Sequence, residues 1–236
     1  MSFVWILSLG FILGLKHAVE SDHLAAVSTI VSERKGLLSS TIVGGIWGLG
    51  HTVSLVVAGI FVLLLDFHIS EQNERFLEFC VGVMLVLLGL NVVRKLLHGD
   101  ELHFHAHKHH GHRHAHPHIH KPGRDDEKHT HHGFSFSPRP LIIGMVHGLA
   151  GSAALMLLVI PTIESRFVGL LYIVVFGVGS IAGMMLMSFL VGLPFYLTAL
   201  RFNRFNLLLQ SIAGLFSVGL GLIIIYEKGI TENLFG

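Results

Sequence analysis

Five side chains able to bind a metal or a proton lie close together in an otherwise apolar stretch near the N-terminus. They are Lys16, His17, Glu20, Asp22 and His23, and they fall within eight residues. A charge at the centre of a membrane costs about 2.5–3.5 kcal/mol even on the mild insertion scale, so such groups usually face the interior of a helix bundle and serve a function. The spacing His-x4-Asp-His offers two imidazoles and a carboxylate, which suit a borderline transition metal.

An ideal helix does not bring these ligands together. At about 100° per residue, Asp22 lies about 140° and His23 about 240° around the axis from His17. We therefore expect the helix to be interrupted between His17 and His23. We expect Lys16 to be neutralised by Glu20 one turn later, as a structural pair and not as ligands.

Two further histidines lie in apolar segments, His51 within GLGHTVSL and His147 within GMVHGLAG. A single histidine in a membrane helix is more often a packed, hydrogen-bonded residue than a ligand. Four such histidines and an aspartate, with two of the histidines at equivalent positions of an internal repeat, favour ligation. The predicted metal ligands are His17, Asp22, His23, His51 and His147.

The composition requires that helices carry these residues through a lipid bilayer. Hydrophobic residues make up 52% of the 236-residue chain and charged residues only 13%, where soluble proteins average about 25% charged. We predict an all-α polytopic membrane protein with six transmembrane helices, because a crossing needs about 20 apolar residues. The segments are about 3–31, 40–66, 76–97, 140–163, 167–197 and 206–226. The single cysteine, Cys80, excludes an internal disulfide and makes thiol–disulfide exchange an unsuitable function.

An internal repeat relates the two halves of the chain. GLKHAVESDHLA (14–25) aligns with GMVHGLAGSAAL (144–155), and GLGHT (48–52) aligns with GVGSI (177–181) at nearly the same offset. Three helices per half is an odd number, so the halves insert in opposite orientations. Inverted repeats are typical of secondary transporters, whose substrate site lies near the midplane between broken helices. The alternative is that the glycines only let helices pack closely.

A histidine-rich loop separates the repeats. It covers residues 99–138, between a first repeat at 1–98 and a second at 139–236, and 14 of the 19 histidines fall between positions 98 and 132. Its lack of apolar residues predicts disorder, and its imidazoles can bind several transition metals with little discrimination. Lysine and arginine are concentrated in the first, third and fifth loops, which predicts that the histidine-rich loop is cytoplasmic and that both termini are outside.

These motifs resemble the nickel/cobalt transporter family, in its six-span branch of urease-accessory and nickel/cobalt efflux proteins. Residues 17–23, HAVESDH, are similar to that family's H-A-x-D-A-D-H signature, with Glu20 in place of its first aspartate. Residues 49–52, LGHT, are similar to its L-G-H-S/T motif. The acidic motif G-F-D-T-A-T-E of the long nickel permeases is absent, since the fourth span reads GMVHGLAGSAAL. The resemblance supports metal binding by His17, Asp22, His23 and His51, while His147 depends on the repeat.

We expect a secondary transporter that carries a divalent metal ion, Ni²⁺ or Co²⁺, as its substrate, with no cofactor and no enzymatic activity. A zinc transporter is the alternative within transport, and an intramembrane metal-dependent hydrolase with Glu20 as its base is the alternative among enzymes. The expected location is a prokaryotic inner membrane, so the lipid bilayer is a partner and nucleic acid is not. A homo-oligomer or a metallochaperone partner is compatible with the sequence.

Overall fold

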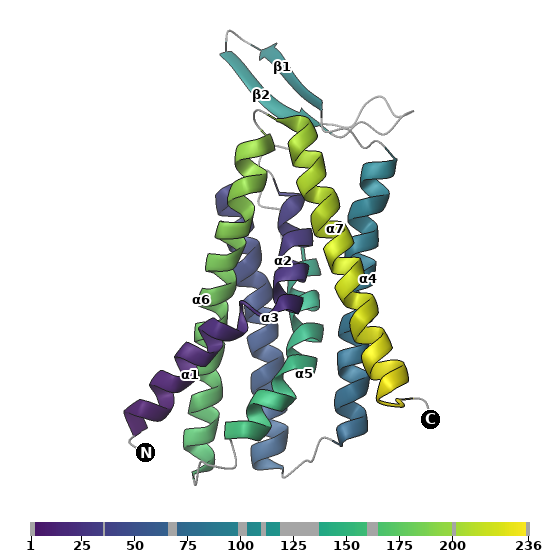
Figure 1. The fold of residues 1–236 in the computed structure, drawn as a ribbon. Coiled ribbons are helices and arrows are strands. Elements are labelled where there is room, and N and C mark those ends of the chain that lie inside the picture. The colour runs from purple at the N-terminus through teal and green to yellow at the C-terminus, as the bar shows by residue number, and fades with distance from the viewer. Residues whose placement is uncertain are drawn as a thin grey trace.

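The protein is a bundle of long helices, shown in Figure 1. The computed structural model describes residues 3–34, 36–65, 70–98, 103–109, 112–118, 137–159, 165–199 and 202–234. The helices are α1 (Phe3–His17), α2 (Ser21–Ser32), α3 (Leu37–Leu64), α4 (Glu71–Leu97), α5 (Arg139–Val159), α6 (Arg166–Ala199) and α7 (Asn203–Tyr226), which a short π-helix η2 (Glu227–Thr231) follows. Residues 167–197, predicted to form one long helix despite Pro194, lie within α6.

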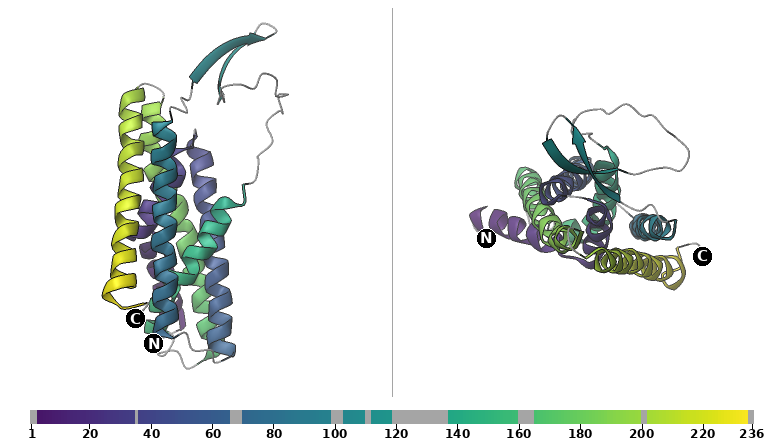
Figure 2. Two further views of the ribbon diagram at one scale, coloured as in Figure 1. Left: turned by 90° about the vertical axis from the view of Figure 1, so that its right-hand side faces the viewer. Right: turned by 90° about the horizontal axis from the view of Figure 1, so that it is seen from above.

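The helices pack in two groups, one around α3 and α6 and one around α4 and α7. α3 and α6 contact each other at the centre of the bundle, α1 packs on α6, and α5 packs on α3. α4 and α7 form a second pair, and α2 contacts α6 and α7. The N-terminal end of α1 and the C-terminal end of η2 lie at one end of the bundle, as Figures 1 and 2 show.

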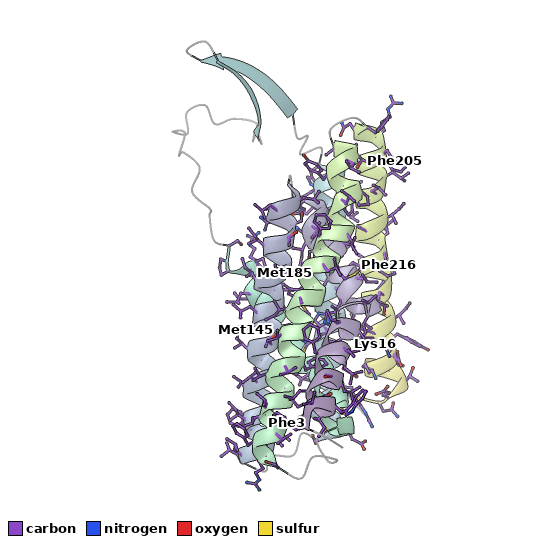
Figure 3. The ribbon with its side chains drawn as sticks, turned by 90° about the vertical axis from the view of Figure 1, so that its left-hand side faces the viewer. Phe3, Lys16, Met145, Met185, Phe205 and Phe216 are labelled. Atoms are coloured by element: carbon purple, nitrogen blue, oxygen red, sulfur yellow. The ribbon has the colours of Figure 1, made fainter. Side chains whose placement is uncertain are left out.

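The outer surface of the bundle is apolar, as lipid contact requires. Phe3, Phe205 and Phe216 are each about half exposed, and Figure 3 shows them on the outside of the helices. Among the described residues, four helices are long and apolar enough to cross a membrane: α3, α4, α6, and α7 with η2. The bent pair α1–α2 makes a fifth crossing if it is one span. The prediction of an all-α polytopic membrane protein is confirmed at this level.

Glycines let the helix backbones approach closely at three interfaces. A Cβ on Gly14 of α1 would meet the backbone of Phe176 and Ser180 in α6. A Cβ on Gly144 of α5 would meet the backbone of Trp47 in α3. α4 and α7 meet in the same manner through Gly82, Gly89, Gly214 and Gly221. No other residue type lets the main chains lie so near each other.

Two strands lie within the histidine-rich loop. β1 (His103–His109) pairs antiparallel with β2 (His112–His118), in a register that places His103 opposite His118 and His107 opposite His114. The expectation that residues 99–138 form a disordered loop between two repeats stays a prediction. Residues 137 and 138 are also described, and the other residues of this loop are outside the described part of the chain.

Candidate metal centre

The first span is broken where the candidate ligands lie, as the sequence predicts. α1 ends at His17, α2 begins at Ser21, and the two helices are bent by 56°. The backbone N–H of Glu20 donates to the carbonyl of His17 at 3.1 Å, which closes a tight turn in place of the α-helical ladder. Glu20 itself is extended, with φ −64° and ψ 150°, and the N–H of Leu24 donates to its carbonyl as α2 begins.

The break also explains why one predicted ion pair is wrong. Lys16 was expected to pair with Glu20, but that pairing needs a continuous helical turn. Because the helix ends at His17, the Glu20 carboxylate instead lies 2.9 Å from Nδ1 of His17. Lys16 is exposed, in α1 near the turn, and it is not one of the groups that could hold a metal (Figure 3).

The structure brings all five predicted ligands together from four helices. His17 comes from the end of α1, Asp22 and His23 from the first turn of α2, His51 from α3 and His147 from α5. The four histidines are 0–2% exposed, so their rings are removed from solvent and lipid. The rings lie close to one another: the centroid of His23 is 4.3 Å from that of His17, 4.1 Å from that of His147 and 5.3 Å from that of His51.

The donor atoms divide into two sets that share one residue. His17, His23 and His51 form one set, and Asp22, His23 and His147 form the other. Within each set, one ligand atom from every residue lies within 4.8 Å of the others. Ligands about 2.0–2.1 Å from one transition metal are separated by about 3–4 Å, so small side-chain movements would complete either set.

Asp22 is the residue that orients the second set. One of its oxygens, Oδ1, accepts from the backbone N–H of His23 at 2.9 Å and lies 3.1 Å from Nδ1 of the same ring. The other, Oδ2, lies 2.9 Å from Nε2 of His147. The position suits a carboxylate, because the first turn of a helix presents free N–H groups and the positive end of its dipole.

Several imidazole nitrogens of this cluster are buried without a partner. They are Nε2 of His17, Nε2 of His23, both ring nitrogens of His51 and Nδ1 of His147. A buried polar atom without a hydrogen bond costs about 1–3 kcal/mol. Several such atoms in one cluster therefore need an explanation. A bound cation satisfies neutral imidazole nitrogens directly, and the donor set of nitrogen and carboxylate oxygen fits Ni²⁺, Co²⁺ or Zn²⁺.

Two aromatic residues that the sequence analysis did not single out close the centre. The Trp47 ring lies 5.3 Å from the His23 ring and 5.7 Å from the His147 ring, and the Phe176 ring lies 5.5 Å from the His17 ring. The repeat offers a signal that could have found them, because 129 residues separate Trp47 from Phe176, as they separate Gly48 from Gly177. Both side chains are buried, at 1% and 3% exposure.

Comparison with known proteins gives a matching family and a relative that aligns over nearly its whole length. Residues 25–223 match the family described as the transmembrane region of cytochrome C biogenesis proteins. The urease accessory protein UreH of a Bacillus species (strain TB-90) is 41% identical over 235 residues, which is 98% of this chain and 94% of UreH. No solved structure is detectably similar to the chain.

More distant relatives extend the comparison. The chloroplast protein FOR GROWTH AND FERTILITY 2 of Arabidopsis thaliana is 27% identical over 96% of this chain and 57% of its own length. A high-affinity nickel transport protein of Cupriavidus necator is 32% identical over 71 residues, which is 30% of this chain and 20% of its own length. The UreH match spans both chains almost completely and the nickel transport protein matches as well, so the chain belongs to the nickel/cobalt transporter family, with a membrane region of the cytochrome C biogenesis type.

Proposed function

We propose that the protein is a secondary transporter of divalent nickel, and that the cation passes through the cluster of His17, Asp22, His23, His51 and His147. The observation that carries the proposal is the set of unpartnered imidazole nitrogens, held around one carboxylate inside a membrane bundle. Intramembrane ionisable groups of this kind mark ion pathways. The relatives named for urease assembly and for nickel transport favour Ni²⁺ over other ions.

The chemistry of the ligands does not by itself distinguish nickel from its neighbours. Imidazole and carboxylate also bind Co²⁺ and Zn²⁺, and the general affinity order places Ni²⁺ above Co²⁺. Co²⁺ is therefore proposed as a second substrate. Zn²⁺, which favours four tetrahedral ligands, would also find enough donors here, so the flux experiment below includes it.

Two overlapping ligand sets suit transport better than permanent binding. His23 belongs to both sets, so a cation can exchange His17 and His51 for Asp22 and His147 without leaving His23. Each set offers only three residues, which leaves room for water or a fourth donor. A site that binds through few and exchangeable ligands releases its ion more readily than a closed shell, as conduction requires.

We propose that the two halves form inverted three-helix repeats and make six spans, with the site near the midplane. The glycine contacts support this. Gly14 packs on Phe176, and residues offset by 129 or 130 make the equivalent contact, in which Gly144 packs on Trp47. The contact of Gly179 with Phe11 repeats as that of Gly50 with Leu141, and the contact of Gly82 with Gly221 repeats as that of Gly89 with Gly214. If the glycines only allowed close packing, there would be no reason for the same contacts to recur between repeat-equivalent residues.

The proposed membrane is a prokaryotic inner membrane, with the histidine-rich loop on the cytoplasmic side and both termini outside. The bias of lysine and arginine toward the first, third and fifth loops supports this orientation. α1 and η2 bring both ends of the described chain to the end of the bundle opposite that loop (Figure 1). Residues 99–138 then collect or buffer metal beside the bundle.

The proposal is tested by measuring the flux of Ni²⁺, Co²⁺ and Zn²⁺ into and out of proteoliposomes, with and without a proton gradient. The full-length chain is expected to carry Ni²⁺, and His51→Ala is expected to lose that flux. His98→Ala is the matched control, because His98 is an exposed histidine at the end of α4 whose Nδ1 lies 3.0 Å from the carbonyl oxygen of Arg94 in the same helix. Equal flux in wild type and His51→Ala would contradict the proposed path.

A further inference from the structure

A polar cavity lies at the end of the bundle where α2 and α4 end and α5 begins. Its volume is about 300 Å³, and side chains of all three helices line it, among them Thr29, Glu33, Asn91, Arg139 and Ile143. The histidine-rich loop joins α4 to α5 at this same end. None of these residues belongs to the candidate metal centre described above.

The two helices that carry Asp22 and His147 also form the walls of this cavity. On α5, Ile143 lines the cavity one helical turn before His147, a rise of about 6 Å. On α2, Thr29 lines it seven residues after Asp22, on the same face, a rise of about 10 Å. Ala26 between them has a small side chain and is fully buried. The cavity therefore points along α2 and α5 toward the carboxylate that joins His23 to His147.

The members of the cluster differ in exposure. Asp22 is 24% exposed, while the four histidines are 0–2% exposed. Asp22 is thus the least buried of the five candidate ligands. Leu88 and Ile143 line the cavity and also pack against the apolar core that contains Ala26 and Trp47, so they form a thin apolar floor between cavity and centre.

One acidic side chain stands at the mouth. Glu33 is the only carboxylate among the described residues that line the cavity, and it is held by α4: its Oε2 lies 2.7 Å from Nζ of Lys95, and its Oε1 accepts from the Asn91 side chain at 3.2 Å. The partners are 35% and 44% exposed, so this ion pair is worth at most about 1 kcal/mol. A link so weak between α2 and α4 opens readily. Arg34 and Arg139 also line the cavity, so its described lining keeps a formal net charge of +1 when Glu33 is released from Lys95, and Glu33 is the group in that lining that attracts a cation.

We propose that this cavity is the water-filled vestibule of the metal path on the side of the histidine-rich loop, and that Glu33, on release from Lys95, is the first carboxylate that the cation meets. The proposal rests on the proposed function for its cargo. The presence of water in the cavity does not depend on which ion is carried, so the vestibule is tested separately from transport. Divalent ions are recognised here by an acidic oxygen at the mouth and by the Asp22 carboxylate beyond the floor.

Cysteine labelling in Cys80→Ser proteoliposomes tests the vestibule, because Cys80 is the sole cysteine of the chain. Ile143→Cys places a thiol in the cavity wall, and Ile142→Cys places one at the same depth on the outer surface, where Ile142 is 55% exposed. A water-soluble maleimide reacts with the thiolate, which forms in water and not in lipid. We expect Ile143→Cys to react about ten-fold faster than Ile142→Cys or more.

Each outcome of this labelling separates the vestibule from transport itself. No reaction at Ile143→Cys, with normal Ni²⁺ flux, overturns the vestibule and leaves the transporter standing. Equal reaction at both positions also overturns it, since the water would not be confined to the cavity. Reaction at Ile143→Cys but not at Ile142→Cys, in a protein that shows no Ni²⁺ flux, supports the vestibule and contradicts the proposed function.

The role of Glu33 is tested with the Lys95→Met variant in the Ile143→Cys background. Without Lys95 the mouth opens more often, so labelling is expected to become several-fold faster. Lys228→Met is the matched control, because Lys228 makes ion pairs with Glu78 and Glu232 at the opposite end of α4. An unchanged rate in Lys95→Met, or the same acceleration in Lys228→Met, overturns the assignment of Glu33 to the mouth.

Discussion

Replacing Gly144 by alanine is expected to destabilise the bundle and to weaken metal binding together. A Cβ at this position would meet the backbone carbonyl of Trp47 and lie 2.9 Å from its Cδ1 atom. Helix propensity alone favours alanine by about 1 kcal/mol. Overpacking against a backbone that cannot rotate away costs about 3 kcal/mol, at the upper end of its usual range. The net loss is about 2 kcal/mol, which lowers the melting temperature by about 4–8 °C for a chain of this size.

The same displacement reaches the metal centre, because Trp47 packs on the His147 ring. Thermal unfolding in detergent, with and without Ni²⁺, measures both effects, since a ligand that binds only the folded state raises its stability. The metal-dependent rise in melting temperature is expected to be smaller in Gly144→Ala than in wild type. Gly14→Ala, at the equivalent contact with Phe176, is expected to lose a similar amount of stability.

Gly219→Ala is the control for helix propensity. Nothing lies within 4 Å of a Cβ at this position, so the substitution is expected to be neutral or stabilising by up to about 1 kcal/mol. A melting temperature for Gly144→Ala equal to or above those of wild type and Gly219→Ala would refute the inferred backbone contact between α3 and α5.

Three further predictions concern the ligands and the loop. His51→Ala should weaken Ni²⁺ binding measured by calorimetry less than His23→Ala, because His51 belongs to one ligand set and His23 to both; equal losses would contradict two sets. Asp22→Asn should abolish Ni²⁺ flux, because the amide keeps the shape of the side chain but lacks its negative charge. Circular dichroism should show that the variant is folded. Residual flux above background would count against Asp22 as a ligand. Deletion of residues 101–132 should leave the melting temperature unchanged, and also the flux at saturating metal, but should alter the flux at low metal concentrations. This effect should fade as pH falls from about 7.5 to about 5.5, because protonated imidazole does not bind metal. Loss of all flux would place the transport path in the loop.

Local sequence was enough to single out the candidate ligands of the first span and to predict the break between them. His17, Asp22 and His23 are costly in lipid and point in different directions on an ideal helix, so both their role and an interruption could be expected. The structure contains that interruption. His51 and His147 were found because their segments and the internal repeat set them apart from ordinary packed histidines.

The contacts between distant segments could not be predicted from local patterns. That Asp22 bonds to His147 depends on how α5 docks against α2, which no periodicity specifies. The predicted pair of Lys16 and Glu20 was wrong because the same break that converges the ligands removes the helical turn on which the pair depended. Trp47 was overlooked because a tryptophan in an apolar helix is usually core, and only its docking places it beside two histidines.

The division of the ligands between the halves has a consequence for the order of synthesis. The ribosome makes α1 to α4 and the whole histidine-rich loop before it reaches His147 in α5. Until then Oδ2 of Asp22 lacks its partner, and the faces of α1 and α3 that carry Gly14 and Gly50 lack the helices they pack against. A nascent chain therefore carries four of the five candidate ligands and the whole histidine-rich loop before it has the fifth. The arrival of α5 adds His147 to the cluster, while the contact of Gly14 waits for α6.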